Sequence, residues 1–203
     1  MVNSLRDLQQ RLGATRWCLA GYSLGGNFSL RVALRAPAAG LDIGRVVAVN
    51  PVIDPAAAMH AMENGIGFYE RYFERKWTRS LRIKQQCFPE LYGDESWYAI
   101  RGLRERTHYL ATRHAGFESA DEYFMGYSIA GERLAALSVP STILTSADDP
   151  VVPVADFEKL PDNPALELII ARHGGHCGFL KNWKMESIAE DLIAERFLER
   201  DEA

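Results

Sequence analysis

Four short apolar runs, most of them followed by a helical pattern, limit what this 203-residue chain can fold into. The runs are rich in leucine and β-branched residues and occupy residues 16–20, 45–49, 141–145 and 166–170. Strands that are apolar on both faces are typical of parallel sheets, because the crossover helices cover both sides. The alternation of strands and helices therefore predicts an α/β fold with a mostly parallel sheet flanked by helices.

Helical periodicity is expected in three places around these runs. The segment 4–12 places leucines on one face, and a second helix follows the first run and continues to about Arg35 before Pro37 stops it. The last helix is expected at about 183–198. Four of its apolar side chains should face inward: Ile188, Leu192, Ile193 and Phe197.

The composition changes between the second and third runs. No strand-like run occurs at about 54–137, and aromatic residues are frequent there. We expect a helical cap inserted into a single domain that spans 1–203. The aromatic rings either fill a small core of the cap or line an apolar substrate pocket, since binding pockets are mostly apolar and aromatic. Both interpretations can hold for different rings.

The first apolar run leads directly into a G-x-S-x-G motif, Gly21-Tyr22-Ser23-Leu24-Gly25. A strand before the motif and a helix after it are the context of a nucleophile elbow. The sharp turn predicts a strained backbone at Ser23, with the small residues Gly21 and Gly25 avoiding clashes. Ser23 would then project from the sheet at the positive end of a helix. The alternative is a plain glycine turn with an incidental serine.

A serine hydroxyl needs a base to take its proton, and the candidate is His176. It lies in a glycine-rich loop after the fourth run, and His173 in the same loop is the rival. The H-x-x-H spacing next to Cys177 resembles a zinc motif, but no further cluster of ligands is evident, so we expect no metal.

The imidazole in turn needs a carboxylate that orients it, and two adjacent aspartates follow the third run. We favour Asp149, which precedes Pro153 by four residues, while Asp148 would brace the turn; the reverse assignment stays open. The order Ser, Asp, His along the chain is that of α/β-hydrolases. The backbone N–H of Leu24 is the expected oxyanion donor, because it follows the nucleophile.

Charge and composition make other classes of function less favourable. The net charge is −4, so no basic excess is available to hold a nucleic acid backbone. No apolar run reaches the roughly 18–20 residues of a membrane-spanning helix, and no signal peptide is evident. Three widely spaced cysteines are not a disulfide framework, which favours a cytoplasmic location.

Several segments together resemble the α/β-hydrolase superfamily, and within it the YheT-like (AB-hydrolase type 4) esterases and lipases. The resemblance covers nearly the whole chain. It is carried by the elbow at 21–27, the segment 116–140, the acid loop at 147–150 and the histidine loop at 173–179. It implies a catalytic triad of Ser23, Asp149 and His176.

The chain departs from this family before the elbow. Family members are typically longer and carry several strands and an oxyanion loop there. We therefore expect an N-terminally truncated chain, with weak or no activity in isolation because a second oxyanion donor is missing. The run at 16–20 would then expose an apolar sheet edge, which another part of the protein or a partner chain would cover.

The sequence thus predicts a serine carboxyl-ester hydrolase that forms an acyl-enzyme and needs no cofactor. The family and the aromatic cap suggest short- to medium-chain or lipid-like esters as substrates. Two alternatives stay open. One is a catalytically impaired, hydrolase-like binding module, and the other is an acyltransferase or thioesterase that uses the same triad, because a fold does not determine a substrate.

Overall fold

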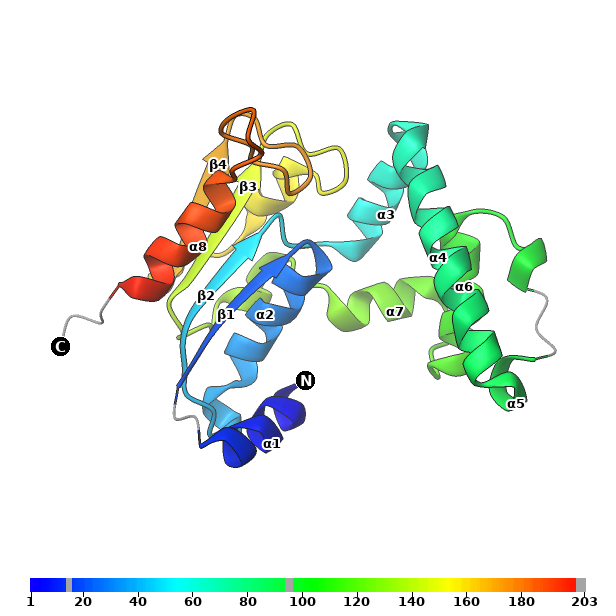
Figure 1. Ribbon diagram of the computed structural model, residues 1–203, viewed down its shortest axis with the longest axis horizontal. Helices are drawn as coiled ribbons and strands as arrows, with labels where there is room; N and C mark the ends of the chain where they lie inside the picture. Colours follow the sequence, from blue (N-terminus) through cyan, green and yellow to red (C-terminus); the bar gives the residue numbers. More distant parts are fainter. Residues whose placement is uncertain (14–15, 94–96, 200–203) are drawn as a thin grey trace. The chain divides into compact units, whose positions relative to one another are not determined.

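The computed structural model describes residues 1–13, 16–93 and 97–199. The chain forms two compact units. One, which we call the sheet unit, combines Met1–Asp54 with Ile129–Ala203, and the other, the helical unit, is Pro55–Ser128. Figure 1 shows both units.

The sheet unit contains four parallel strands in the order β1-β2-β3-β4 (Figure 1). Their bounds are Trp17–Tyr22, Ile43–Val49, Ser141–Ser146 and Leu166–Ala171. Tyr22, Val49, Leu144 and Ile169 are neighbours across the sheet. The α/β prediction is confirmed, and the register brings the residues that follow each strand to one edge of the sheet.

The strands differ in burial. All residues of β3 and nearly all of β2 are buried, whereas β1 alternates between half-buried and exposed residues and β4 is only partly covered. The expectation of burial on both faces was therefore correct for the inner strands and wrong for β1 and β4. The physical reason is position, because the two outer strands have a neighbour on one side only.

The helices of the sheet unit are α1 (Val2–Leu12), α2 (Leu24–Arg35) and α8 (Ile188–Leu198), with 3₁₀ turns at Pro37–Ala39, Gly131–Leu134 and Val154–Lys159. Of these, α2 and α8 cover opposite faces of the sheet. A Cβ added to Gly26 of α2 would meet the Cβ of Ala48, whereas Val49 belongs to the cluster that packs against Leu192 of α8. Consecutive strand residues point to opposite faces, so α2 and α8 lie on opposite sides of β2.

The last helix begins later than expected. It starts at Ile188 instead of about residue 183, because Ser187 is its N-cap and accepts a hydrogen bond from the Ala189 N–H. Ser187 also pairs with Leu180 in an isolated antiparallel bridge. Leu192 and Ile193 pack against the core as predicted, but Ile188 is 50% exposed, and Ala189 takes the buried position instead.

The helical unit contains α3 (Pro55–Asn64), α4 (Gly67–Cys87), α5 (Pro89–Tyr92), α6 (Leu103–His114) and α7 (Ala120–Tyr127), with a 3₁₀ turn at Trp97–Ala99. Its buried cluster comprises Met59, Leu103, Ala120 and Phe124. Aromatic side chains from α4 and α7 pack around this cluster, so part of the aromatic content forms a core. Across the described helices of both units, no stretch combines the length and the hydrophobicity that a bilayer crossing requires.

Candidate active site

Ser23 occupies a tight turn between β1 and α2. Its φ of 52° and ψ of −121° lie outside the regions that ordinary side chains prefer, as the elbow motif predicted. The turn is held from both ends. The Ser23 N–H donates to the Val49 carbonyl at 2.8 Å, and the Ser23 carbonyl accepts from the Asn27 N–H at 3.2 Å. The surrounding hydrogen bonds thus maintain the strained backbone.

The glycines of the motif have unequal roles. A Cβ at Gly21 would lie 2.3 Å from the backbone of Gly25, so only glycine fits there. A Cβ at Gly25, in contrast, would meet nothing within 4 Å. The steric reason expected for Gly25 is therefore wrong. It applies instead to Gly26, where a Cβ would lie 3.0 Å from the Gly21 carbonyl oxygen and 3.1 Å from the Pro51 side chain.

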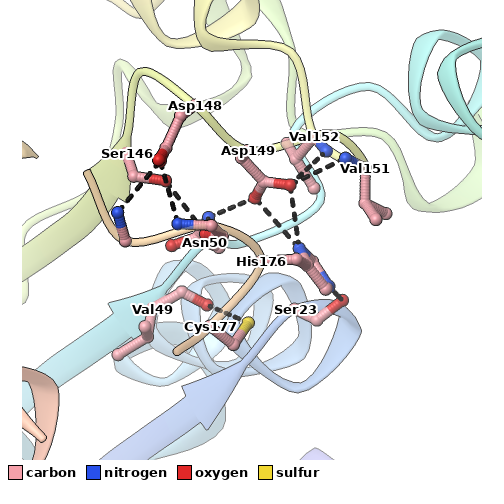
Figure 2. A network of polar contacts seen from close by, with 12 residues as sticks. Ser23, Val49, Asn50, Ser146, Asp148, Asp149, Val151, Val152, His176 and Cys177 are labelled. Carbon is pink, nitrogen blue, oxygen red and sulfur yellow. Dashed lines mark hydrogen bonds and ion pairs between the residues drawn. The ribbon is translucent and has the colours of Figure 1, made fainter. Parts of the chain in front are cut away.

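His176 lies in the loop after β4 and reaches the elbow (Figure 2). Its Nε2 is 3.0 Å from the Ser23 Oγ, and its Nδ1 is 2.9 Å and 3.1 Å from the two carboxylate oxygens of Asp149. The imidazole thus lies between a hydroxyl and a carboxylate, although 153 positions separate Ser23 from His176 in the chain. A neutral imidazole with Nδ1–H on Asp149 can accept the Ser23 proton at Nε2.

Asp149 is fully buried, with a side-chain exposure of 0%. A buried carboxylate needs partners, and backbone amides supply two of them. The N–H groups of Val151 and Val152 donate to its Oδ1 at 2.7 Å and 3.1 Å. Its orientation is therefore determined before His176 contributes a hydrogen bond.

Asp148 and His173, the rival candidates, form a second pair next to this one. Asp148 Oδ1 accepts hydrogen bonds from the Gly174 and Gly175 N–H groups, each at 2.9 Å, and its Oδ2 is 3.3 Å from His173 Nδ1. The Gly175 amide is the largest influence that lowers the pKa of Asp148 to about 2. His173 is 75% exposed. The structure thus brings Asp149 to His176, and Asp148 to the backbone of the histidine loop.

The chain is similar to known proteins over most of its length. A model described as the Alpha/beta hydrolase family matches residues 2–184. The chain belongs to this family. The Escherichia coli (strain K12) protein named "Putative esterase YheT" is 29% identical over 182 residues, which are 87% of this chain and 52% of that protein. Human "Phospholipase ABHD3" is 28% identical over 102 residues, 49% of this chain and 25% of that protein.

Solved structures share the fold. An alpha/beta hydrolase enzyme, MGS-M2, from a Medee basin deep-sea metagenome library matches 100% of this chain and 72% of its own, with a TM-score of 0.54 and 17% identity. MGS-MChE2, from a lagoon sediment metagenome of Mar Chica, Morocco, gives a TM-score of 0.52 at 18% identity and matches 97% of this chain and 69% of its own. The chain spans about half the length of YheT.

Asn50 is a site residue of this α/β-hydrolase that sequence reasoning missed. It follows β2, has a φ of 43°, and donates hydrogen bonds to Asp149 and, at 3.2 Å, to the Gly175 carbonyl. Ser146 donates to the same carbonyl at 2.9 Å. Asparagine tolerates positive φ better than most residues. An Asn-Pro pair directly after a buried strand was the available signal, because strand ends of a parallel sheet meet at one edge.

The environment of His176 raises the pKa of its imidazole. Burial alone lowers that pKa, but hydrogen bonds to Asp149 and Cys177 and the nearby negative charges outweigh burial and raise it to about 9. The free site therefore favours imidazolium at neutral pH. In serine hydrolases with a catalytic triad, the carboxylate stabilises this charged form when the proton leaves the serine.

Leu24 is the first residue of α2, with Ser23 as the N-cap. The first four amides of a helix have no acceptor within the helix, and they form its positive end. The Leu24 N–H can therefore stabilise negative charge beside the Ser23 hydroxyl. The described residues contain no group of three or more His, Cys, Asp or Glu side chains placed to hold a metal ion.

Proposed function

We propose that this α/β-hydrolase is a serine carboxyl-ester hydrolase in which Ser23, His176 and Asp149 form the catalytic triad. The observation that supports this most is the 3.0 Å separation between Ser23 Oγ and His176 Nε2 together with a fully buried Asp149 on the Nδ1 side. Nucleophile, base and orienting acid are the three roles that acyl transfer by serine requires.

In the proposed reaction, Ser23 Oγ attacks the ester carbonyl carbon while His176 Nε2 takes the hydroxyl proton. Asp149 stabilises the imidazolium, and the Leu24 N–H donates to the oxyanion of the tetrahedral intermediate. Collapse of the intermediate releases the alcohol, which receives the proton from His176. Water then attacks the acyl-enzyme by the same route and regenerates the Ser23 hydroxyl.

The proposed substrates are short- to medium-chain or lipid-like carboxylic esters. The names of the relatives, an esterase and a phospholipase, support an ester substrate. We further propose that the two units belong to one α/β-hydrolase domain and that the helical unit, Pro55–Ser128, is the cap expected at about 54–137. The chain spans about half the length of YheT. The activity and the substrate class are therefore proposed, in the same way as the triad.

Hydrolysis of 4-nitrophenyl butyrate and labelling by a fluorophosphonate test the proposal. Ser23→Ala should abolish both, and peptide mapping should locate the adduct on Ser23. Ser80→Ala, at an exposed position of α4, is the matched control and should change neither. A folded chain that is labelled elsewhere, or not at all, would favour the non-catalytic alternative. Heat-unfolded chain should remain unlabelled.

A further inference from the structure

The helical unit contains a pocket of its own. It has a volume of about 540 Å³, and every residue that lines it belongs to Pro55–Ser128. None of the residues assigned to catalysis contributes to it. Pockets of roughly 300–1,000 Å³ enclose drug-sized ligands, so this volume suits one small organic molecule.

Most of the wall is apolar and comes from three helices. On α4, Phe73, Trp77 and Leu81 repeat at four-residue spacing and so lie along one face. Leu103 and Leu110 of α6 line the same pocket. The aromatic side chains of α7 complete the wall: Tyr123, Phe124 and Tyr127. Such a surface matches an alkyl chain, because burial of methylene groups is favourable and needs no hydrogen-bonding partner.

A lysine and a histidine meet at one part of this wall. The Lys84 ammonium lies 4.7 Å from the centre of the Tyr92 ring, and the His114 ring lies 4.5 Å from the same ring, so the three side chains form one cluster. Lys76 also lines the pocket. No acidic side chain is among the lining residues. Within the described part of the chain, neither lysine ammonium makes an ion pair with a carboxylate.

We propose that this pocket binds a single-chain carboxylate, such as a medium-chain fatty acid. The alkyl chain would lie against Phe73, Trp77 and Phe124, and the carboxylate would lie beside Lys84 and His114. The apolar wall and the Lys84 ammonium together match an anionic amphiphile, and each alone would match a different ligand. This inference does not rest on the proposed esterase activity, since a free acid binds without turnover.

Calorimetric titration of the 203-residue chain with hexanoate, octanoate and decanoate tests the apolar wall. Each buried methylene contributes about 0.8 kcal/mol, which is about fourfold in affinity, so each pair of methylenes should strengthen binding by about fifteenfold. Nonyltrimethylammonium has the same alkyl chain as decanoate with the opposite charge and should bind more weakly than decanoate. An affinity independent of chain length, or equal affinity for both charges, would overturn the proposal.

Variants locate the site within the helical unit. Lys84→Glu should weaken decanoate binding by about fivefold at low salt, and the effect should fade at high salt because the group is exposed. Arg79→Glu makes the same change of charge on α4 at an exposed position outside the pocket and is the control. Equal effects of the two variants would contradict the assignment of the head group to Lys84.

Ala115→Trp fills the pocket from a lining position that is exposed, so the fold should tolerate it. We expect it to abolish decanoate binding while the circular dichroism spectrum stays native. Retention of wild-type affinity in this folded variant would place the fatty acid elsewhere and overturn the inference.

Discussion

The elbow and the two loops after β3 and β4 meet at one site but are held in place by different forces. At the elbow, backbone sterics dominate: Gly21 leaves no room for a Cβ, and Ser23 adopts a positive φ. In the loops, hydrogen bonds to side chains dominate, with Asp148 on the Gly174 and Gly175 amides and Asp149 on the Val151 and Val152 amides.

The two kinds of constraint differ in how much change they tolerate. A steric constraint gives way only if the backbone moves, so it responds abruptly to a single added methyl group. A hydrogen-bonded loop shares its constraint among several donors and acceptors, so the loss of one bond has a graded effect.

Replacement of Asp148 and Asp149, one at a time, should show most clearly that the two carboxylates have different roles. Asp149→Asn removes the charge that orients and stabilises the His176 imidazolium, and we expect the rate of fluorophosphonate labelling at Ser23 to fall by about 10³–10⁴. Asp148→Asn keeps an oxygen that can accept from the Gly174 and Gly175 amides, so its rate should stay within about tenfold. Equal losses would show that the two carboxylates share one role.

The glycines should respond with opposite signs. Gly21→Ala puts a Cβ 2.3 Å from the Gly25 backbone and should lower the free energy of unfolding by about 3 kcal/mol. Gly25→Ala meets nothing within 4 Å inside α2 and should raise it by about 0.5–1 kcal/mol through helix propensity. Urea titration measures both changes. Destabilisation by Gly25→Ala would show that Gly25, like Gly21, is required for steric reasons.

The raised pKa of His176 predicts the dependence on pH. Because neutral imidazole is the base, kcat/KM should rise with pH and reach half its maximum near pH 9. The folded pKa of about 9 exceeds the ordinary 6.5, so the protonated form stabilises the fold. That contribution, up to about 3 kcal/mol, is complete below pH 6.5 and lost as pH rises through 9. In Asp149→Asn, the pH at which kcat/KM reaches half its maximum and the pH at which this stability is lost should both be lower.

Asn50 should have a smaller effect than Gly21, and a pair of variants separates its two roles. Asn50→Gly keeps the positive φ without strain but loses the hydrogen bonds to Asp149 and the Gly175 carbonyl, which should cost about 1–2 kcal/mol of stability. Asn50→Ala loses the same bonds and adds about 1 kcal/mol of backbone strain. Equal unfolding midpoints for the two variants would mean that the φ of 43° is not a constraint.

The elbow was predictable from sequence because its causes are local. Strand, glycine, serine and helix follow one another within about 20 residues, and each restricts the backbone of the next. The strands were predictable for a similar reason, as short apolar runs. The start of α8 was not predictable, since the capping bond from Ala189 to Ser187 and the bridge between Leu180 and Ser187 stop the helical pattern from extending toward Trp183.

The loops and the helical pocket were less predictable, because their causes are distant in sequence. The sequence left Asp148 and Asp149 as alternatives, and only contacts with residues 173–176, more than 20 positions away, distinguish them. Asn50 meets Asp149 across 99 positions. In the helical unit, the stripe of Phe73, Trp77 and Leu81 is visible in the sequence, but a cavity depends on how several helices pack.

We propose that His176 activates Ser23. The rate of fluorophosphonate labelling at Ser23 reports the reactivity of the Ser23 hydroxyl and so measures this activation. His176→Ala should lower this rate by about 10²–10⁴, because the base that removes the hydroxyl proton is lost. His173→Ala, in the same loop and 75% exposed, should leave it within about threefold. Unchanged labelling of Ser23 in a folded His176→Ala variant would contradict the account.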